Sequence, residues 1–145
     1  MKKIMMGLCF VMASTVMYAG GMNIPTHVRD AFHKDYPDAS AVHWKYTNGK
    51  WDASFHKMDG NMTVWACYDL KGKHIDSRMP VAQSAIPVKL QRKLDSQYPG
   101  QYNHHLTKVE IPNKRDLYQV KVKEEGSYRT KYFDRRGHER DYASR

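Results

Sequence analysis

One sequence pattern occurs twice in this chain and constrains its fold more than any other feature. It begins with Ile24-Pro25, ends with Tyr36-Pro37, and has apolar residues four apart between these ends. The same pattern runs from Ile86-Pro87 to Tyr98-Pro99, displaced by 62 residues. A self-similar pattern at a fixed spacing indicates a structural unit that is built more than once. We therefore predict two tandem copies of one small module.

Each copy begins with a predicted helix. Apolar residues four apart form a stripe along one side of a helix, wide enough to pack against a neighbour. The stripe residues between the two ends are Val28, Phe32, Leu90 and Leu94. A proline opens each helix, where its missing N–H is not needed, and a second proline excludes helical geometry at the tyrosine before it. The pattern predicts helices over about 25–35 and 87–97.

After each helix the apolar residues alternate with polar ones, which is the period of a strand with one buried face. The alternating runs are 42–46, 51–55, 64–68, 109–111, 118–122 and 128–132. The predicted turns between them are Asn48-Gly49, Asp59-Gly60, Pro112-Asn113 and Glu125-Gly126. This order predicts an α+β fold of two tandem repeats, each one helix packed on an antiparallel three- to four-stranded meander.

A second motif also occurs twice. Tyr68-Asp69-x-x-Gly72 in copy one matches Phe133-Asp134-x-x-Gly137 in copy two at a displacement of 65. Because the helices are displaced by 62, copy two carries about three extra residues between its helix and this turn. Loops between strands are where such insertions are tolerated.

The residues in these motifs resemble the PepSY-like family of exported bacterial proteins, which is also compared with the β-lactamase-inhibitor-protein (BLIP) fold. The shared features are the Ile-Pro helix ending in Tyr-Pro, the Val42-x-Trp44 strand and the aromatic-Asp-x-x-Gly turn, and they span about 22–142. The resemblance implies a tandem helix-plus-sheet architecture, a periplasmic or extracellular location, and a binding or inhibitory role. Copy two departs from the pattern with Val109 in place of Trp44. The two disulfides typical of the inhibitor cannot form here, which argues against β-lactamase inhibition.

The first residues have the order of a secretory signal. Two lysines after Met1 precede an apolar run over 4–17, and small residues follow it. This run is shorter than the roughly 18–20 residues that span a bilayer. We expect cleavage after Ala19 or Gly21, no transmembrane anchor afterwards, and a periplasmic or secreted location. The predicted organisation is a signal peptide at 1–21, a first repeat at 22–80 and a second repeat at 81–145.

Cleavage would leave a basic chain with one cysteine. Loss of Lys2 and Lys3 lowers the formal charge from +9 to +7. This balance favours anionic partners such as acidic proteins, glycans or lipid head groups, although a solvated basic surface would have the same composition. We expect no nucleic-acid partner. Cys67 alone cannot form an internal disulfide, so the fold must depend on its apolar core.

The sequence contains no signature of an enzyme or a metal site. No nucleophile elbow or glycine-rich phosphate loop occurs, and Cys67 lies in a predicted strand where an inert thiol is expected. His104-His105, and His43 with His56, lack a cysteine or carboxylate at ligand spacing. We therefore predict no catalytic residue, no cofactor and no metal.

The candidate binding residues follow from strand alternation. Six aromatic residues share the predicted helix-covered face: Trp44, Trp51, Phe55, Tyr68, Tyr118 and Tyr132. Trp65 is out of phase with Val64 and Ala66, so its ring is predicted on the opposite, open face. The residues predicted to share that open face and to bind a partner are Trp65, His43, His56, Lys121, Lys123, Arg129 and Lys131.

Two hypotheses of function follow. The first is a non-catalytic, exported binding or inhibitor-like module that holds a cell-envelope protein or peptide on its open sheet faces, and an acidic partner would suit the cations. The alternative is a binder of an anionic polymer or lipid surface through the basic sheet face of copy two. An enzyme is a third, weaker hypothesis.

Overall fold

The computed structural model describes residues 23–57, 62–102 and 104–142. The predicted signal peptide at 1–21 and the predicted Asp59-Gly60 turn lie outside the described residues. Within these ranges the elements, in order, are α1 (Thr26–Asp35), β1 (Ser40–Thr47), β2 (Lys50–His56), β3 (Thr63–Asp69), β4 (His74–Val81), a 3₁₀ turn (Gln83–Ala85), α2 (Val88–Gln97), β5 (Leu106–Glu110), β6 (Leu117–Glu124), β7 (Ser127–Phe133) and β8 (Glu139–Arg140).

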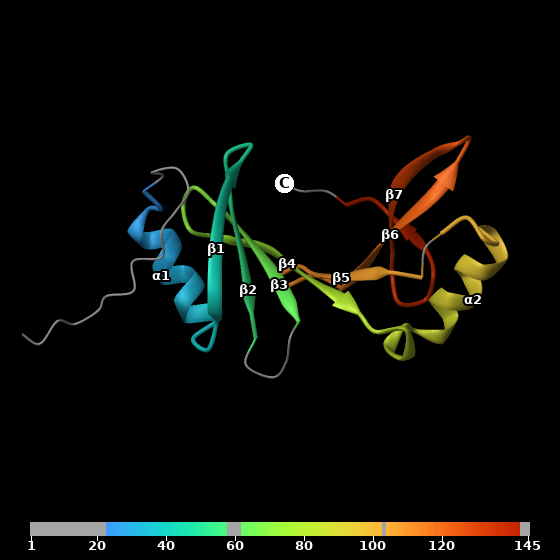
Figure 1. The fold of residues 1–145 in the computed structure, drawn as a ribbon, viewed down its shortest axis with the longest axis horizontal. Coiled ribbons are helices and arrows are strands. Elements are labelled where there is room, and N and C mark those ends of the chain that lie inside the picture. Colours follow the sequence, from blue (N-terminus) through green and yellow to red (C-terminus); the bar gives the residue numbers. More distant parts are fainter. Residues whose placement is uncertain (1–22, 58–61, 103, 143–145) are drawn as a thin grey trace, which may run out of the picture.

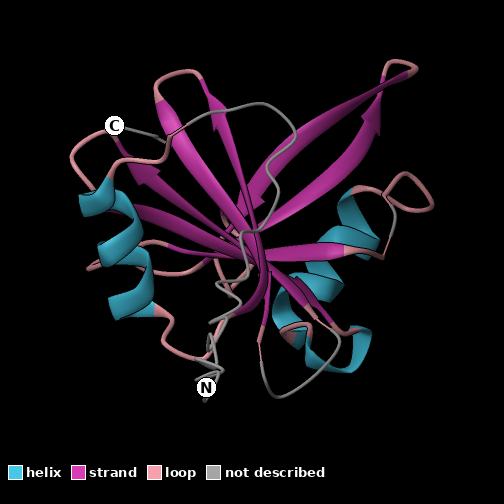
Figure 2. Cartoon of the chain, turned by 60° about the vertical axis from the view of Figure 1, so that its left-hand side comes forward, coloured by secondary structure: helices cyan, strands magenta, loops and turns pink. Residues whose placement is uncertain are grey.

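The strands form one antiparallel sheet of eight strands in the order of the sequence, from β1 to β8. The two meanders join where β4 pairs with β5, over Ser77↔Glu110 to Val81↔Leu106. Figure 1 shows α1 and α2 at opposite ends of the molecule with the sheet between them. In Figure 2 the strands fan out from the centre, so the sheet is strongly twisted. The predicted fold class is confirmed, with four strands in each copy.

Both helices begin and end where the repeated prolines predict. Pro25 and Pro87 directly precede the first helical residues of α1 and α2. Each helix stops before its tyrosine, whose N–H still donates to a helical carbonyl, that of Phe32 for Tyr36 and that of Leu94 for Tyr98. The stripe residues at the centre of each helix are fully buried. The helix predictions are therefore confirmed.

Each helix covers its own apolar cluster on the sheet. The α1 core consists of Val28, Phe32, Trp51, Ala53, Phe55, Val64, Ala66 and Tyr68. The α2 core consists of Ile86, Leu90, Leu94, Tyr98, Tyr102, Leu106, Val120, Val122 and Phe133. Met79 packs against the α1 core and Val81 against the α2 core, and these residues are two apart in β4. Because alternate residues share a face, both helices lie on one face of the sheet, and we call the other the open face.

Five of the six aromatic residues predicted on the helix-covered face lie there. Trp51, Phe55 and Tyr68 are buried, while Trp44 and Tyr118 pack against the clusters and stay partly exposed. Trp44 is on the outermost strand, β1, where its ring makes an edge contact with Phe32 at 5.1 Å between centroids. Tyr132 is the exception. It pairs with Gln119 on the open face, so its predicted position is wrong.

The repeated aromatic-Asp-x-x-Gly motif is a turn that docks onto the start of a helix. Asp69 Oδ1 accepts hydrogen bonds from the backbone N–H groups of Lys71 and Lys73, both at 2.8 Å. Gly72 has a φ of +79°, and a Cβ placed on it would lie 2.9 Å from the carbonyl oxygen of His27 in α1. In copy two, Asp134 and Gly137 repeat this arrangement against α2. The motif thus fixes the distance between each helix and its sheet.

The extra residues of copy two lie in a single loop. Trp44 and Leu106 are equivalent helix-side residues of the first strands, 62 apart, whereas Trp51 and Tyr118 in the second strands are 67 apart. Five additional residues therefore lie between β5 and β6, and a shorter β6–β7 turn reduces the net difference to three. Leu106, rather than Val109, is thus the counterpart of Trp44, so the predicted exchange at Val109 is corrected.

Candidate binding face

The open face is continuous across both copies. Cross-strand partners form a row from β1 to β6: His43, Ser54, Trp65, Arg78, Val109 and Leu117. A second row in copy one consists of Lys45, Asp52, Cys67 and Asp76. The first row crosses the β4–β5 junction, and the second ends beside it at Asp76. A partner bound to copy one would therefore also lie beside copy two.

A groove of about 450 Å³ lies on this face. Its lining residues are His43, Trp44, Lys45, Asp52, Ser54, Trp65, Cys67, Asp76, Arg78, Thr107 and Gln119. Trp65 retains 42% of its surface in contact with solvent, which is large for an indole at the centre of a sheet. Its neighbours across the strands are the small Ser54 and the cationic Arg78. The groove therefore combines one exposed aromatic ring with charged side chains of both signs.

The end of the described chain crosses the middle of the open face. The ring of Tyr142 stacks on Tyr132 at 4.8 Å between centroids, and Arg78 lies over the Tyr142 ring at 5.7 Å. The Tyr142 hydroxyl donates to Asp76 and accepts from Arg78. Burial, followed by the hydrogen bond to Asp76, raises the pKa of Tyr142 to about 12. Tyr142 thus covers the β4 side of the groove, while Trp65 in β3 stays exposed.

Asp76 and Arg78 form a fixed ion pair inside this groove. Asp76 is 1% exposed, and its carboxylate accepts from Nε and Nη2 of Arg78 at 3.1 and 3.2 Å. Such a forked arrangement satisfies both oxygens of a buried carboxylate and holds the guanidinium plane in place. Arg78 therefore presents a preoriented cation beside Trp65.

Cys67 on the same face is not an activated nucleophile. It is free and 6% exposed. Burial, followed by the negative charge of Asp52, raises the pKa of the Cys67 thiol to about 12. The thiolate, which is the nucleophilic form, is therefore scarce at neutral pH.

The two histidines predicted to bind a partner are exposed, but they do not face each other. The register pairs His43 with Ser54 and His56 with Ser40. A bulge lies between these two pairs. Among the described residues, no group of three or more histidine, cysteine, aspartate or glutamate side chains could hold a metal ion.

The four predicted cations of copy two do not share one face. Lys121 and Lys123 alternate with the buried Val120 and Val122, so they lie on the open face as predicted. Arg129 and Lys131 pair directly with these two valines, and the prediction that they lie on the open face is wrong. Partners in antiparallel strands point to the same side, which places both cations on the helix-covered face.

Lys131 is tolerated on the helix-covered face because acidic and aromatic groups surround its amine. Its Nζ lies 2.9 Å from Glu124, 3.3 Å from Glu139 and 5.5 Å from the centroid of the Tyr98 ring. The hydrogen bond to Glu124 raises the pKa of Lys131. The repeat itself contained this signal, because Phe133 matches Tyr68 and Lys131 therefore matches the helix-side Ala66.

Asp35, His74 and Ser77 form a chain of polar contacts under α1 of the kind found in the catalytic triads of hydrolases. No sequence motif predicted this chain. His74 Nδ1 lies 3.4 Å from Asp35 Oδ2, and its Nε2 lies 2.8 Å from Ser77 Oγ. A nucleophile must reach its substrate, yet Ser77 is 1% exposed and its hydroxyl also bonds the Tyr36 hydroxyl. This network joins the end of α1 to β4, and its geometry does not suit acyl transfer.

Several solved structures share this fold. A DUF2874 family protein from Bacteroides ovatus is 22% identical with a TM-score of 0.71, and the match covers 82% of this chain and 86% of that one. A BLIP-like protein from Bacteroides fragilis is 20% identical with a TM-score of 0.69, covering 84% of this chain and 89% of that one. A proposed periplasmic protein from Bacteroides eggerthii is 14% identical with a TM-score of 0.70, covering 81% and 86%.

These TM-scores establish a common fold, and identities of 14–22% show no more than that. The resemblance to PepSY-like and BLIP-like proteins that the sequence predicted is confirmed at that level. The sequence itself matches no family model and no curated protein. Across the described residues, no helix has the length and apolar character needed to cross a membrane.

Proposed function

We propose that this chain, whose fold is that of BLIP-like and DUF2874 family proteins, is a non-catalytic exported protein that binds a cell-envelope protein or peptide on the open face of its sheet. The observation that carries the proposal is the groove around Trp65. Tryptophan, tyrosine and arginine are enriched among the residues that contribute most binding energy in protein interfaces, so a tryptophan beside an arginine is a favourable pair. Trp65 beside Arg78 provides that pair.

Three further features support this function. Both helices lie on the other face, so no helix covers the open face of copy one, where Tyr142 contacts Asp76 and Arg78. The groove contains the buried, paired Asp76 and the inert thiol of Cys67. The periplasmic location proposed for the Bacteroides eggerthii protein of the same fold is compatible with the expected signal peptide.

The alternative function is anion binding through the open sheet face of copy two. The fold places only two of its four predicted cations on that face. Lys121 and Lys123 remain on the open face, whereas Arg129 and Lys131 lie on the other side. Lys131 is also neutralised by Glu124 and Glu139. A pair of lysines on one strand is an ordinary solvated surface. We therefore favour the groove around Trp65 as the functional site.

The test is a comparison of Trp65→Ala with Tyr46→Ala. Trp65 is 42% exposed on the open face, and Tyr46 is 39% exposed on the helix-covered face, so the two changes remove aromatic rings of similar exposure. Each should lower the free energy of unfolding by about 1 kcal/mol or less, because exposed substitutions have small effects. Trp65→Ala should weaken binding of the envelope partner that the parent protein retains by about thirtyfold, because a hot spot contributes about 2 kcal/mol or more, while Tyr46→Ala should leave it unchanged.

Binding is measured by titrating the purified partner, and stability by thermal melts of the same samples. Equal affinities for both variants and the parent would remove the open face as the binding site. Unfolding of Trp65→Ala would instead show that the indole belongs to a buried interface.

A further inference from the structure

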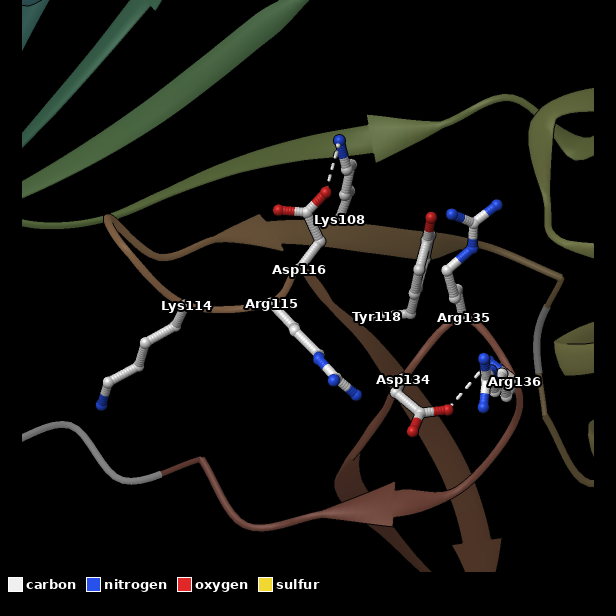
Figure 3. A pocket seen from close by; sticks show the side chains of 8 residues that line it. All are labelled: Lys108, Lys114, Arg115, Asp116, Tyr118, Asp134, Arg135 and Arg136. Atoms are coloured by element: carbon white, nitrogen blue, oxygen red, sulfur yellow. Dashed lines mark hydrogen bonds and ion pairs between the residues drawn. The ribbon is translucent and has the colours of Figure 1, made fainter.

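A second cavity, of about 650 Å³, lies in copy two between the β5–β6 loop and the turn that follows β7 (Figure 3). Its lining residues are Lys108, Lys114, Arg115, Asp116, Tyr118, Asp134, Arg135 and Arg136. Lys108 and Tyr118 pair with each other and lie on the helix-covered face, so this cavity is separate from the groove around Trp65. Its volume is in the range of small-molecule sites, but charged side chains dominate its walls.

The two acids of this cavity are already neutralised. Asp116 lies 3.1 Å from Lys108 Nζ. Asp134 is held by Arg140 Nη2 at 2.9 Å and by His138 Nδ1 at 3.1 Å, and its other oxygen accepts two backbone N–H groups. Both carboxylates therefore have cationic partners, and Asp116 shares Lys108 with Glu110, which lies 2.6 Å from the same amine.

Four cations of the cavity have no such partner. Lys114, Arg115, Arg135 and Arg136 form no ion pair with any described residue. In the view of Figure 3, Arg115 and Arg136 lie on either side of Asp134. Asp141 lines an adjoining cavity together with Lys114 and Arg115, but it makes an ion pair with neither. With five cations and two acids in its lining, the cavity carries an excess of three positive charges.

The insertion that distinguishes copy two builds one wall of this cavity. Lys114 and Arg115 lie in the β5–β6 loop, where copy one has only the Asn48-Gly49 turn. The loop is ordered by a turn in which the Lys114 N–H donates to the Ile111 carbonyl at 3.0 Å, and Asn113 supplies the positive φ of 61°. The other wall is the aromatic-Asp-x-x-Gly turn, which places Arg135 and Arg136 opposite.

The start of α2 adds to the positive potential. Pro87, Val88 and Lys89 line a neighbouring cavity together with Arg135 and Arg136. The first turn of α2 has no acidic residue and no side-chain cap, and the N-terminus of a helix carries partial positive charge. Arg135 and Arg136 lie beside this helix N-terminus and repel its partial positive charge. An anion bound between the arginines and the helix would relieve this repulsion.

We propose that this cavity binds a ligand with two phosphate groups. A phosphate carries about −1.5 to −2 charges at neutral pH, so two phosphates supply about three to four negative charges and match this excess, whereas three carboxylates would be needed. Arginine side chains bind phosphate oxygens in a planar, two-pronged geometry, and three of the four cations are arginines. The diphosphate group belongs either to a soluble compound or to a lipid head group. The site is independent of the proposed function on the open face.

The experiment titrates pyrophosphate into the signal-cleaved protein by calorimetry, with Arg115→Gln/Arg136→Gln as the cavity variant. Lys121→Gln/Lys123→Gln is the matched control, because it removes the same two charges from exposed positions on the open face. The cavity variant should bind pyrophosphate at least tenfold more weakly, and the control should stay within about twofold of the parent. Equal weakening of both variants, or no binding by the parent at millimolar pyrophosphate, would overturn the proposal.

A second arm distinguishes the two sources of the diphosphate group. The same three proteins are sedimented with phosphatidylcholine vesicles that contain a lipid with a diphosphate head group, and with vesicles of phosphatidylcholine alone. Binding to the diphosphate vesicles that the cavity variant loses and the control keeps would support a lipid ligand. Binding of pyrophosphate alone, with the same loss, would support a soluble ligand. Vesicle binding that both variants lose equally contradicts a defined site, because diffuse attraction depends only on total charge.

Discussion

Gly72→Ala is expected to lower the free energy of unfolding by about 2–5 kcal/mol. A left-handed backbone costs a residue with a Cβ about 1–2 kcal/mol, and the φ of Gly72 is +79°. The new methyl would also lie 2.9 Å from the backbone oxygen of His27, which can move only if α1 moves. Overpacking of this kind costs about 1–3 kcal/mol. Urea unfolding of the parent and the variant measures the sum.

Gly49→Ala is the matched control. Gly49 has nearly the same φ, +75°, but a Cβ there would meet nothing within 4 Å. The control should therefore lose only the backbone part, about 1–2 kcal/mol. If both variants lose the same stability, the glycine is required for its backbone angle alone, and the close approach of the turn to α1 has no energetic role. Gly137→Ala should behave as Gly72→Ala does, because its Cβ would lie 2.8 Å from Cβ of Lys93.

Asp134→Asn is expected to cost about 2 kcal/mol at pH 7, and this cost should shrink in acid. Burial alone would raise the pKa of Asp134, but the hydrogen bonds from Arg140 and from the backbone N–H groups of His138 and Arg136 outweigh it and hold the pKa well below its usual range. Hydrogen bonds to a charged group contribute about 1.5–3 kcal/mol. The Asp134 side chain is 10% exposed, but those of Arg140 and His138 are 50% and 60% exposed, so solvent screens part of the ion-pair contribution.

The direction of the pH effect follows from the lowered pKa. The ionised carboxylate stabilises the fold above the unfolded pKa of about 3.9, and this contribution is lost as the pH falls from there through the folded pKa. Urea unfolding at pH 7 and pH 2 should therefore show a smaller difference between parent and variant at pH 2. Asp69 lies at the equivalent turn of copy one and has no arginine partner among the described residues. Asp69→Asn should therefore lower the free energy of unfolding less than Asp134→Asn does at pH 7. A pH-independent cost for Asp134→Asn would exclude a role for the carboxylate charge.

The repeat made most of the fold predictable. Two prolines and a four-residue apolar spacing determined both helices, because these signals are local. The joining of β4 to β5 was not predictable, since no alternating run was assigned to β4 and only the short run 109–111 overlaps β5. The pairing also connects residues about 25–33 apart in the sequence, from Val81↔Leu106 to Ser77↔Glu110. The continuity of the sheet across both copies is therefore evident only from the three-dimensional structure.

The site was predictable where alternation was unambiguous. Trp65 lies between two buried residues of β3, so its outward position followed directly. In β7, Tyr128, Thr130 and Tyr132 alternate as a buried face would, but the pairing with β6 places Arg129 and Lys131 on the helix side instead. The phosphate cavity escaped prediction because its cations come from two loops that are distant in sequence.

Site-specific photo-crosslinking tests the central claim, binding through the open face, most directly. A photoreactive residue at Ser54 lies between His43 and Trp65 in the groove, whereas one at the exposed Arg29 lies on α1, on the other side of the sheet. After incubation with an envelope fraction and illumination, we expect a discrete protein adduct from position 54, which Trp65→Ala abolishes, and none from position 29. An adduct from position 29 but not from position 54 would contradict the account.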